Sequence, residues 1–527
     1  MQISVHTPIL FLLCYFLQST ALLQAQKPDL QLNKQSLVFS AIMGTPSKAD
    51  TLLLSLPEGN LQIGKAYLTG EHAAQFRMYV PEIGRISKDN PLNIALWFEP
   101  EDGFAGLAKA ILKVDAPSGK ELASANLTGL STKALEGKNE APLSLIVEAL
   151  GYQMNPGWKE LAHHTKAIPQ GDELAPSLFQ KAGAGAVEIR PVARYSPPFH
   201  LPFGYYTPSA EGPELHQIGI LNDSRDYPEH QTLFPSIASG NTSFDPGDNT
   251  FGFYTASPTH IAYSEDIWNI LFYEENTAHA MRAYPVTAEH GKVLENAYLL
   301  CFEEASNGDY QDYVFLVQNV RPVPIETKFV SLLNDNDLEG WYTFLQSKGK
   351  NNDPENIFTV KDGELHDIGK ELGYVSTEKH YTNFHFKLEF RWGEKKWPPR
   401  DTSKRDSGIC YHIPDGEPDQ IWPRSIECQI QEGDVGDFWL LGYSTILVDG
   451  KQNVPLRHSR IVKKQDAEKA HGEWNTVEVI SFNGQCVHIV NGVVANAGQH
   501  ASLRKGRILL QSEYAEIYYR NVSIREL

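Results

Sequence analysis

The sequence has few cysteines, and their spacing excludes the common structural uses of this residue. Of five cysteines in 527 residues, one, Cys14, lies in the apolar N-terminal segment. The rest are too sparse for a disulfide framework, and the lack of a C-x-x-C pair argues against a structural zinc site. We expect buried thiols, with one disulfide as the alternative in an oxidising compartment. The four are Cys301, Cys410, Cys428 and Cys486.

An excess of positive charge is also lacking. The net charge of −19 argues against nucleic acid or an anionic membrane surface as the main partner. Hydrophobic residues make up 41% of the chain and charged residues 21%, which is typical of a folded soluble protein. The length predicts roughly two to four domains.

Long apolar runs are absent except at the start, MQISVHTPILFLLCYFLQSTALLQAQ. The apolar run extends from Ile9 through Leu23, and small residues and glutamine follow it. We interpret residues 1–26 as a secretory signal peptide. Because no Lys or Arg precedes the run, a transmembrane anchor is the alternative. No later segment is apolar enough to span a bilayer. We therefore expect export, to the periplasm, the cell surface or the extracellular space.

Stretches with helical periodicity are scarce, whereas short alternating runs bounded by Gly, Pro, Asn and Asp recur throughout. This pattern predicts an all-β protein built from several β-sandwiches. The first, residues 27–137, contains AYLTGEHAAQFRM and PLNIALWFEPEDGFAG, and it resembles immunoglobulin-like modules of secreted bacterial proteins. That resemblance implies a role in spacing or docking.

The second predicted sandwich, residues 143–325, contains the acidic stretch AYLLCFEEASNGDYQDYVFLVQNV. The stretch resembles an acidic motif of a secreted bacterial β-sandwich family. Clustered carboxylates on a glycine-containing turn suit calcium, which takes six to eight oxygen ligands. A solvated acidic turn without an ion is the alternative. The candidate ligands are Glu303, Asp309 and Asp312, with Glu304 beside them and Asp245 from the stretch SFDPGDNTFGFYT.

The third predicted domain, residues 329–527, contains SIECQIQEGDVGDFW. Alternation places Ile426, Cys428 and Ile430 on one strand face, and Glu427, Gln429 and Gln431 on the other. The second row suits a hydroxyl-rich ligand. A retaining glycosidase needs two carboxyl groups about 5–5.5 Å apart. Because Glu432 falls on the opposite face of a regular strand, this strand offers one carboxylate and disfavours that mechanism.

Further polar and aromatic residues could belong to the same face. In NFHFKLEFRW, alternation separates an apolar row from a polar row that includes Arg391, and RDSGICYHI has a similar division. We expect these two strands to be neighbours that form a concave floor. Trp422 and Trp439 are candidates for stacking on a sugar ring, with core packing as the alternative. Gln511 and Glu513 are weaker candidates for the same face.

Several short motifs of the third domain occur in a family-specific order. They include LEGW at 338–341, Ser407–Gly408–Ile409, Glu427-x-Gln429–Ile430, Glu473–Trp474–Asn475 and His488-x-x-Asn491–Gly492. With these motifs the domain resembles the 3-keto-α-glucoside 1,2-lyase/3-keto-2-hydroxy-glucal hydratase family, also called 3-keto-disaccharide hydrolases. The resemblance implies a concanavalin-like jelly roll that acts on 3-keto-glycosides.

Cleavage of a 3-keto-glycoside needs a base near C2 and a positive or hydrogen-bonding group at the C3 oxygen. We predict Glu427 as base, His412 as acid and Arg405 as the group that stabilises the enolate. A divalent metal held by His412, Glu427 and Asp434 could replace Arg405. Asp437, in the glycine-containing loop after the strand, is a candidate for substrate contact.

Each of these residues also has a purely structural alternative. Arg405 and Asp406 could form a surface ion pair, and His412 could be a hydrogen-bonded strand histidine. Asp434 and Asp437 could serve the loop alone. At the level of the whole protein, a carbohydrate-binding protein without activity is the main alternative to an enzyme, since jelly rolls serve as lectins too. An adhesive surface protein is the third possibility.

Overall fold

The computed structural model describes residues 30–527 except 82–83, 162–167, 175–177, 225–226, 273–277 and 304–306. The predicted signal peptide and Glu304 lie outside the described residues. The chain forms two compact units. One contains most of the N-terminal sandwich, and the other contains the chain from Gly129 to Leu527 with two short earlier segments. Among the described residues, every helix is too short or too polar to cross a membrane.

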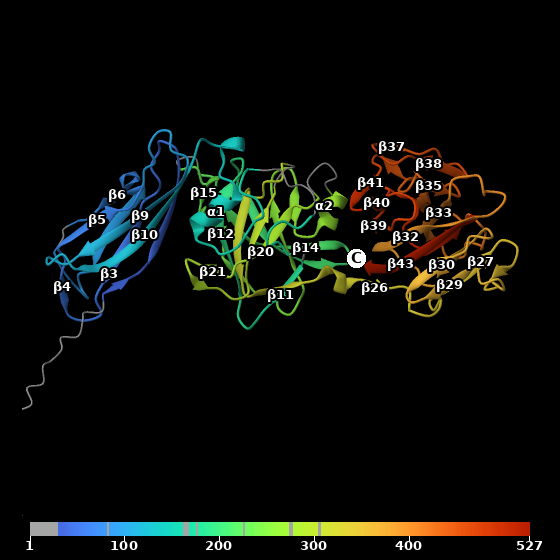
Figure 1. Cartoon of the computed structure of the whole chain (residues 1–527), viewed down its shortest axis with the longest axis horizontal. Helices are drawn as coiled ribbons and strands as arrows, with labels where there is room; N and C mark the ends of the chain where they lie inside the picture. The colour runs from blue at the N-terminus through green and yellow to red at the C-terminus, as the bar shows by residue number, and fades with distance from the viewer. Residues whose placement is uncertain are drawn as a thin grey trace, which may run out of the picture. The chain divides into compact units, whose positions relative to one another are not determined.

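The first unit has two four-stranded antiparallel sheets (Figure 1). Their inner faces carry alternating apolar side chains such as Leu52, Leu54, Ile94 and Leu96, all buried. One sheet has the order β1 (Gln31–Leu32), β3 (Asp50–Ser55), β8 (Leu92–Phe98) and β6 (Phe76–Tyr79). The other has the order β2 (Ser36–Ile42), β10 (Glu121–Thr132), β9 (Gly106–Asp115) and β5 (Lys65–Thr69).

The middle of the chain forms a second sandwich, with helices α1 (Leu143–Leu150) and α2 (Asp266–Phe272). A cluster of buried apolar side chains lies between its two sheets and includes Phe203, Phe253 and Phe315. One sheet contains β15 (Gln231–Leu233), β12 (Val187–Tyr195), β24 (Tyr313–Gln318), β23 (Ala297–Phe302) and β20 (Met281–Pro285), with β17 (Ser243–Phe244) beside β12. The other contains β16 (Ile237–Gly240), β14 (Gly212–Leu221), β13 (Leu201–Ser209), β18 (Gly252–Ala256) and β19 (Ile261–Tyr263).

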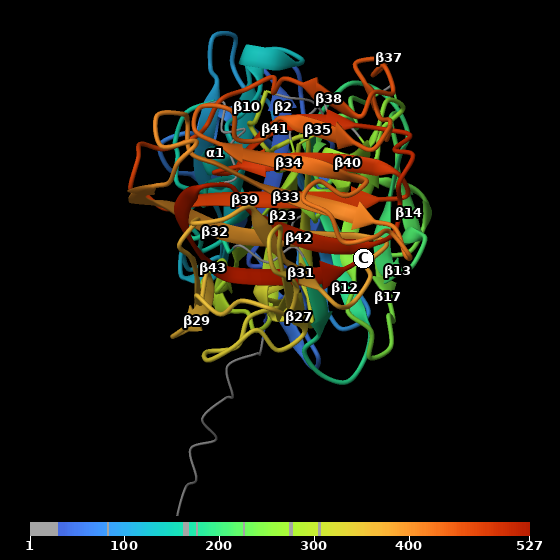
Figure 2. The same ribbon diagram turned by 90° about the vertical axis from the view of Figure 1, so that its right-hand side faces the viewer.

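The C-terminal sandwich has two eight-stranded sheets, here called the front and back sheets. In the front sheet, seen across the strands in Figure 2, the order is β28 (Gly349–Lys350), β27 (Trp341–Leu345), β31 (Gly373–Thr377), β42 (Arg507–Ser512), β33 (Asp406–Ile413), β34 (Ser425–Gln431), β35 (Phe438–Leu441) and β38 (His458–Ile461). In the back sheet it is β29 (Phe358–Lys361), β30 (Glu364–Asp367), β43 (Ala515–Glu526), β32 (Phe384–Lys396), β39 (Asn475–Phe482), β40 (Gln485–Val490) and β41 (Val493–Gly498), with β26 (Val330–Ser331) beside β43.

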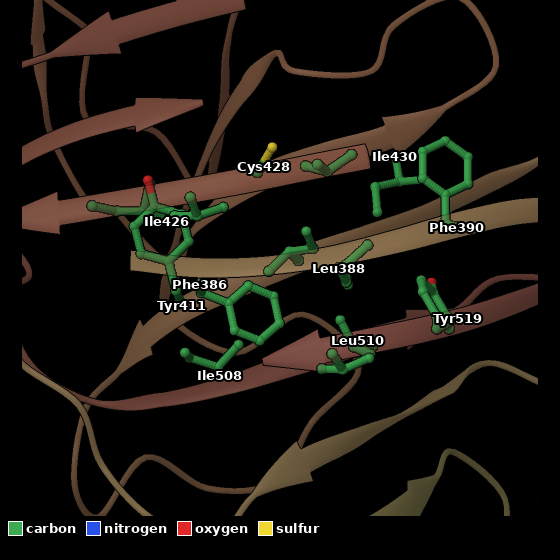
Figure 3. Packing of buried hydrophobic residues seen from close by; sticks show 14 of the residues in the cluster. Phe386, Leu388, Phe390, Tyr411, Ile426, Cys428, Ile430, Ile508, Leu510 and Tyr519 are labelled. Carbon is green, nitrogen blue, oxygen red and sulfur yellow. The ribbon is translucent and has the colours of Figure 1, made fainter. Parts of the chain in front are cut away.

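The C-terminal core lies between these sheets. Figure 3 shows Phe386, Leu388 and Phe390 of β32 opposite Ile426 and Ile430 of β34. All of these side chains are at most 1% exposed. The residues between them in β32 are only partly buried, as the alternation predicts. The all-β prediction is thus confirmed, and the division of β34 into an apolar and a polar row defines which row can meet a ligand.

Asn491–Gly492, a residue pair that favours tight turns between strands, forms a hairpin. Both residues have positive φ, 49° and 79°, as a two-residue type I′ turn between β40 and β41 requires. The four cysteines outside the N-terminal segment are free and buried.

One expectation about the sheets is wrong. The strands NFHFKLEFRW and RDSGICYHI are not neighbours, because β32 pairs with β39 and β43 in the back sheet and β33 pairs with β34 and β42 in the front sheet. The polar row of β32 therefore lies on the opposite outer surface from the polar row of β34. Arg391 accordingly stacks on Trp474 and Tyr518 of the back sheet, with its guanidinium 5.1 and 4.8 Å from the ring centres.

Truncation of the core should destabilise this domain strongly. Leu388 is 1% exposed, so Leu388→Ala leaves a cavity and is expected to cost about 2–5 kcal/mol. Val454→Ala is the control, since Val454 is 66% exposed and surface changes typically stay within about 0.5 kcal/mol. Thermal and denaturant unfolding of both variants measures the difference. Equal stabilities would contradict the packing described.

Candidate functional site

The outer face of the front sheet carries a compact group of polar side chains. In the antiparallel pair β33–β34, Gly408 lies opposite Gln429, Cys410 opposite Glu427 and Asp406 opposite Gln431. On the other side of β34, Glu427 lies opposite Trp439 of β35. Because residues directly opposite each other project from the same face, these side chains share one surface.

Gly408 gives the centre of this surface its shape. A Cβ atom at this position would lie 2.1 Å from Oε1 of Glu427 and 2.4 Å from Oε1 of Gln511. No real side chain tolerates such contacts, so the two oxygen atoms converge over the backbone because residue 408 has no side chain. Glycine within a strand is typical of a close approach of this kind.

A salt-bridged group lies next to Glu427. Arg400 donates from Nη1 to Oε2 of Glu513 at 2.6 Å and from Nη2 to Asp406. The indole N–H of Trp422 donates to the other oxygen of Glu513 at 2.8 Å. The amide of Gln431 donates to Asp406 at 2.6 Å. Both oxygens of Glu513 are therefore occupied.

Glu427 differs from these acids. Its side chain is only 5% exposed, and within the described part of the chain its carboxyl group makes no hydrogen bond or ion pair. Across the neighbouring strands it lies opposite Cys410 and Trp439, and Oε1 of Gln511 converges with its own Oε1 over Gly408. Burial raises the pKa of Glu427 well above its ordinary value, and the charges of Glu513 and Asp406 raise it further.

Glu513 titrates near neutrality. Burial and the charge of Asp406 raise its pKa to about 7, against the hydrogen bonds from Trp422 and Arg400. Burial likewise raises the pKa of Asp406, although Arg400 opposes it. The face therefore combines one unbonded carboxyl group of raised pKa with a second carboxyl group that can exchange a proton near pH 7.

Aromatic side chains flank the acids. Trp439 lies beside Glu427, and its indole N–H is buried without a hydrogen-bond partner among the described residues. Trp422 is 40% exposed. On the same sheet face, a cavity of about 390 Å³ is lined by Tyr342, Asp419 and Arg507. Flat apolar rings beside hydrogen-bonding groups are suited to a sugar ring.

His412 does not join this group. It occupies a bulge of β33 with φ of 58°, and its fully buried ring packs on Phe384 of the back sheet. Its Nε2 lies 2.6 Å from Oγ of Ser481. Burial lowers the pKa of His412 to about 4, so the ring is neutral. The predicted roles of His412 as acid and metal ligand beside Glu427 are therefore not supported by its position.

Arg405 also lies elsewhere. Its guanidinium pairs with Glu432 at 2.8 Å and donates to the carbonyl groups of Gly393 and Glu394 in the back sheet. Odd-numbered residues of this segment face the core side, whereas Asp406 and Gly408 face outward. The alternative considered for Arg405, an ion pair with Asp406, does not form either, because Asp406 pairs with Arg400. Sequence reasoning missed Arg400 because WPPRDTSKRD has no periodicity that orients its side chains.

The two loop aspartates are bound by basic residues. Asp437 is fully buried and accepts hydrogen bonds from Arg460 Nε at 2.6 Å and Lys463 N at 2.8 Å. Asp434 pairs with Lys404 at 2.8 Å and Arg460 at 3.0 Å. These contacts order the Gly433–Gly436 loop and leave neither aspartate near His412.

In the middle domain, the structure brings Glu303, Asp309 and Asp312 together, with one oxygen of each within 4.8 Å of the others. Asp245 is not part of this group. It is an exposed residue that pairs with Lys181 at 2.7 Å.

A family model matches the C-terminal domain. Residues 328–525 match the model of the 3-keto-alpha-glucoside-1,2-lyase-like domain. This match covers the entire front sheet and supports a carbohydrate-active function for the domain. The matched residues include Glu427, Gln429, Trp439, Arg400 and Glu513 in the arrangement described above.

The solved structures that match this chain are only distantly similar to it, and the curated proteins give no match. A proposed glycosyl hydrolase from Parabacteroides distasonis is 21% identical, with 38% of this chain and 95% of that chain covered and a TM-score of 0.29. The carbohydrate-binding module CBM66 from Bacillus subtilis is 9% identical, with 37% and 99% covered and a TM-score of 0.23. No curated protein matches the chain.

The raised pKa of Glu427 predicts a pH-dependent cost in stability. Because the folded-state pKa exceeds the unfolded value, ionisation above the ordinary carboxyl range disfavours the folded state. Glu427→Gln cannot ionise, so it should melt at a higher temperature than the wild type at pH 8. The difference should vanish near pH 4. Thermal melts across this range measure it.

Glu389→Gln is the matched control, with the opposite sign. Although burial raises the pKa of Glu389, hydrogen bonds from Asn521 and Arg520 hold it below the ordinary value. Its ionised form therefore stabilises the folded state, and this variant should melt slightly lower than the wild type at pH 8. A Glu427→Gln variant that is no more stable than the wild type at pH 8 would contradict the electrostatics described.

Proposed function

We propose that the C-terminal domain cleaves 3-keto-glycosides by elimination and hydration, with Glu427 as the general base. The observation that carries this proposal is the unbonded carboxyl group of Glu427, buried on the outer face beside Trp439 and over Gly408. A carboxylate of raised pKa is a stronger base than an ordinary one once ionised. The family match supports the substrate class.

The reaction needs one proton removed and one returned. The C3 ketone acidifies the C2 proton, which passes to Glu427, and the electrons of that bond form an enolate. The enolate collapses to a C1–C2 double bond as the bond from C1 to the leaving oxygen breaks, and that oxygen gains a proton. Water then adds across the double bond, with OH at C1 and H at C2, so that the net reaction is hydrolysis.

Two further residues suit the remaining roles. Arg400 lies next to the acids and provides positive charge for the C3 oxygen, the role first predicted for Arg405. Glu513, with a pKa of about 7, can protonate the leaving oxygen. Trp422 and Trp439 provide ring surfaces, and Gln429 and Gln511 provide amide groups for sugar hydroxyls.

Direct hydrolysis of unmodified glycosides is the second candidate. Considered alone, β34 offers a single carboxylate, but Glu513 brings a second carboxyl group to the same face, and paired carboxyl groups are what classical glycosidases use. Assays on 3-keto-glucosides and on the corresponding glucosides separate the two. Release from both substrates at similar rates would favour direct hydrolysis, whereas binding without release would favour a lectin.

Replacing the base should abolish turnover but keep binding. Glu427→Gln retains the shape of the side chain, so kcat on a 3-keto-glucoside should fall by about 10²–10⁴-fold with little change in KM. Glu389→Gln, on the back sheet, should keep wild-type kcat. Retention of wild-type kcat by Glu427→Gln would eliminate Glu427 as the base.

The glycine in β33 gives an independent test. Gly408→Ala puts a methyl group where the oxygens of Glu427 and Gln511 converge, so kcat/KM should fall at least about tenfold. Gly183→Ala is the control, since its Cβ would meet only Oδ1 of Asn319 at 3.5 Å. Equal activity of the two variants would show that the convergence of these oxygens has no role.

A further inference from the structure

The turn between β23 and β24 of the middle domain holds three buried acids. Strand β23 ends at Phe302 and β24 begins at Tyr313, and these two residues pair. Glu303, Asp309 and Asp312 are 0%, 3% and 7% exposed. One oxygen of each lies within 4.8 Å of the others. Three carboxyl groups at this spacing and burial repel each other strongly when ionised.

Backbone and side-chain N–H groups donate hydrogen bonds to only some of the carboxylate oxygens in this turn. Oε2 of Glu303 accepts hydrogen bonds from the N–H groups of Gly308 and Asp309, at 2.8 and 3.0 Å. Oδ2 of Asp309 accepts one from the amide of Asn307 at 3.0 Å. Oδ1 of Asp309, in contrast, is buried with no hydrogen-bond partner among the residues that the structure describes. A buried acceptor without a donor costs about 1–3 kcal/mol.

A second oxygen in the turn has the same property. Gln311 is fully buried and donates its amide N–H to Glu140 at 3.1 Å, and its Oε1 has no hydrogen-bond partner in the described part of the chain. Gln311 is neutral, so this observation is independent of the acidic group. Two oxygen acceptors of one turn thus lack donors among the described residues, and a cation with oxygen ligands is the kind of partner that satisfies such acceptors.

Burial, followed by the charges of Glu303 and Glu140, raises the pKa of Asp309 to about 8.

We propose that Glu303, Asp309 and Asp312 bind a divalent cation of the calcium class, with the amide oxygen of Gln311 as a further ligand. Carboxylate and amide oxygens are hard ligands, and the turn contains no cysteine or histidine that would favour zinc. The cation would tie the end of β23 to the start of β24, two central strands of the sheet, and would act on the stability of this domain. The proposal is independent of the activity of the C-terminal domain.

Calcium titration of the full chain tests this inference directly. After treatment with a chelator, addition of CaCl2 should raise the melting temperature, and calorimetric titration should show one site. Terbium should bind at the same place with luminescence sensitised by Tyr310, which is buried in the turn. Stabilisation by MgCl2 alone would show that the site belongs to magnesium and would overturn the assignment to the calcium class.

Two aspartate variants separate this site from non-specific binding. Asp309→Asn should weaken calcium affinity at least tenfold, and its melting temperature should no longer respond to calcium. Asp245→Asn is the matched control, because Asp245 lies in the same domain and pairs with Lys181 outside the cluster. It should bind calcium like the wild type.

A variant that fails to fold does not decide the question, so the wild-type titration stands on its own. The absence of any calcium-dependent change in melting temperature or heat up to millimolar calcium would overturn the proposal. Loss of binding in Asp245→Asn with retention in Asp309→Asn would overturn it too.

Discussion

The geometry of the C-terminal domain depends on a single constraint, the two-residue alternation of strands packed in two layers. The core needs Ile426, Cys428 and Ile430 of β34 against β32, so Glu427, Gln429 and Gln431 must project from the outer face. A one-residue slip in register would place a carboxylate in the core and isoleucines on the surface. The packing of the core therefore positions the polar row.

The buried acids beside this polar row lower the stability of the fold when they ionise, and they differ in how far a partner compensates their charge. Arg400 neutralises two of the three neighbouring acids, Asp406 and Glu513, by direct contact. Glu427 receives no such partner and keeps a raised pKa. A group that is expensive to ionise and has no structural bond is the kind of group that functional sites retain.

The middle domain also buries several carboxyl groups, but their hydrogen-bond partners are different. In its acidic turn, backbone N–H groups donate to Glu303, whereas one oxygen of Asp309 has no donor among the described residues. In the C-terminal domain an arginine of the chain itself balances the charge of the acids. In the acidic turn of the middle domain we assign that role to a bound cation. Within one chain, buried carboxyl groups thus have two distinct environments that imply two distinct uses.

Much of this could be inferred from the sequence, because alternation, glycine and turn residues act locally. The β content, the two faces of β32 and β34, the Asn491–Gly492 hairpin and the acidic turn all follow from residues close in the chain. Sheet membership does not, because it depends on pairing between strands that are far apart in the chain. The sequence pattern suggests that β32 and β33 are neighbours, whereas they lie in different sheets. For the same reason Arg405 and His412 were expected beside Glu427, although the strand register and a bulge turn them toward the other sheet. Arg400 comes from an irregular loop, and Glu513 comes from the end of β42, about 85 residues after Glu427 in the chain.

The sequence by itself determined which side chains point away from the core. Only the tertiary structure decided which of these side chains lie close together, because no local period encodes the hydrogen bonds between distant strands or the path of a loop.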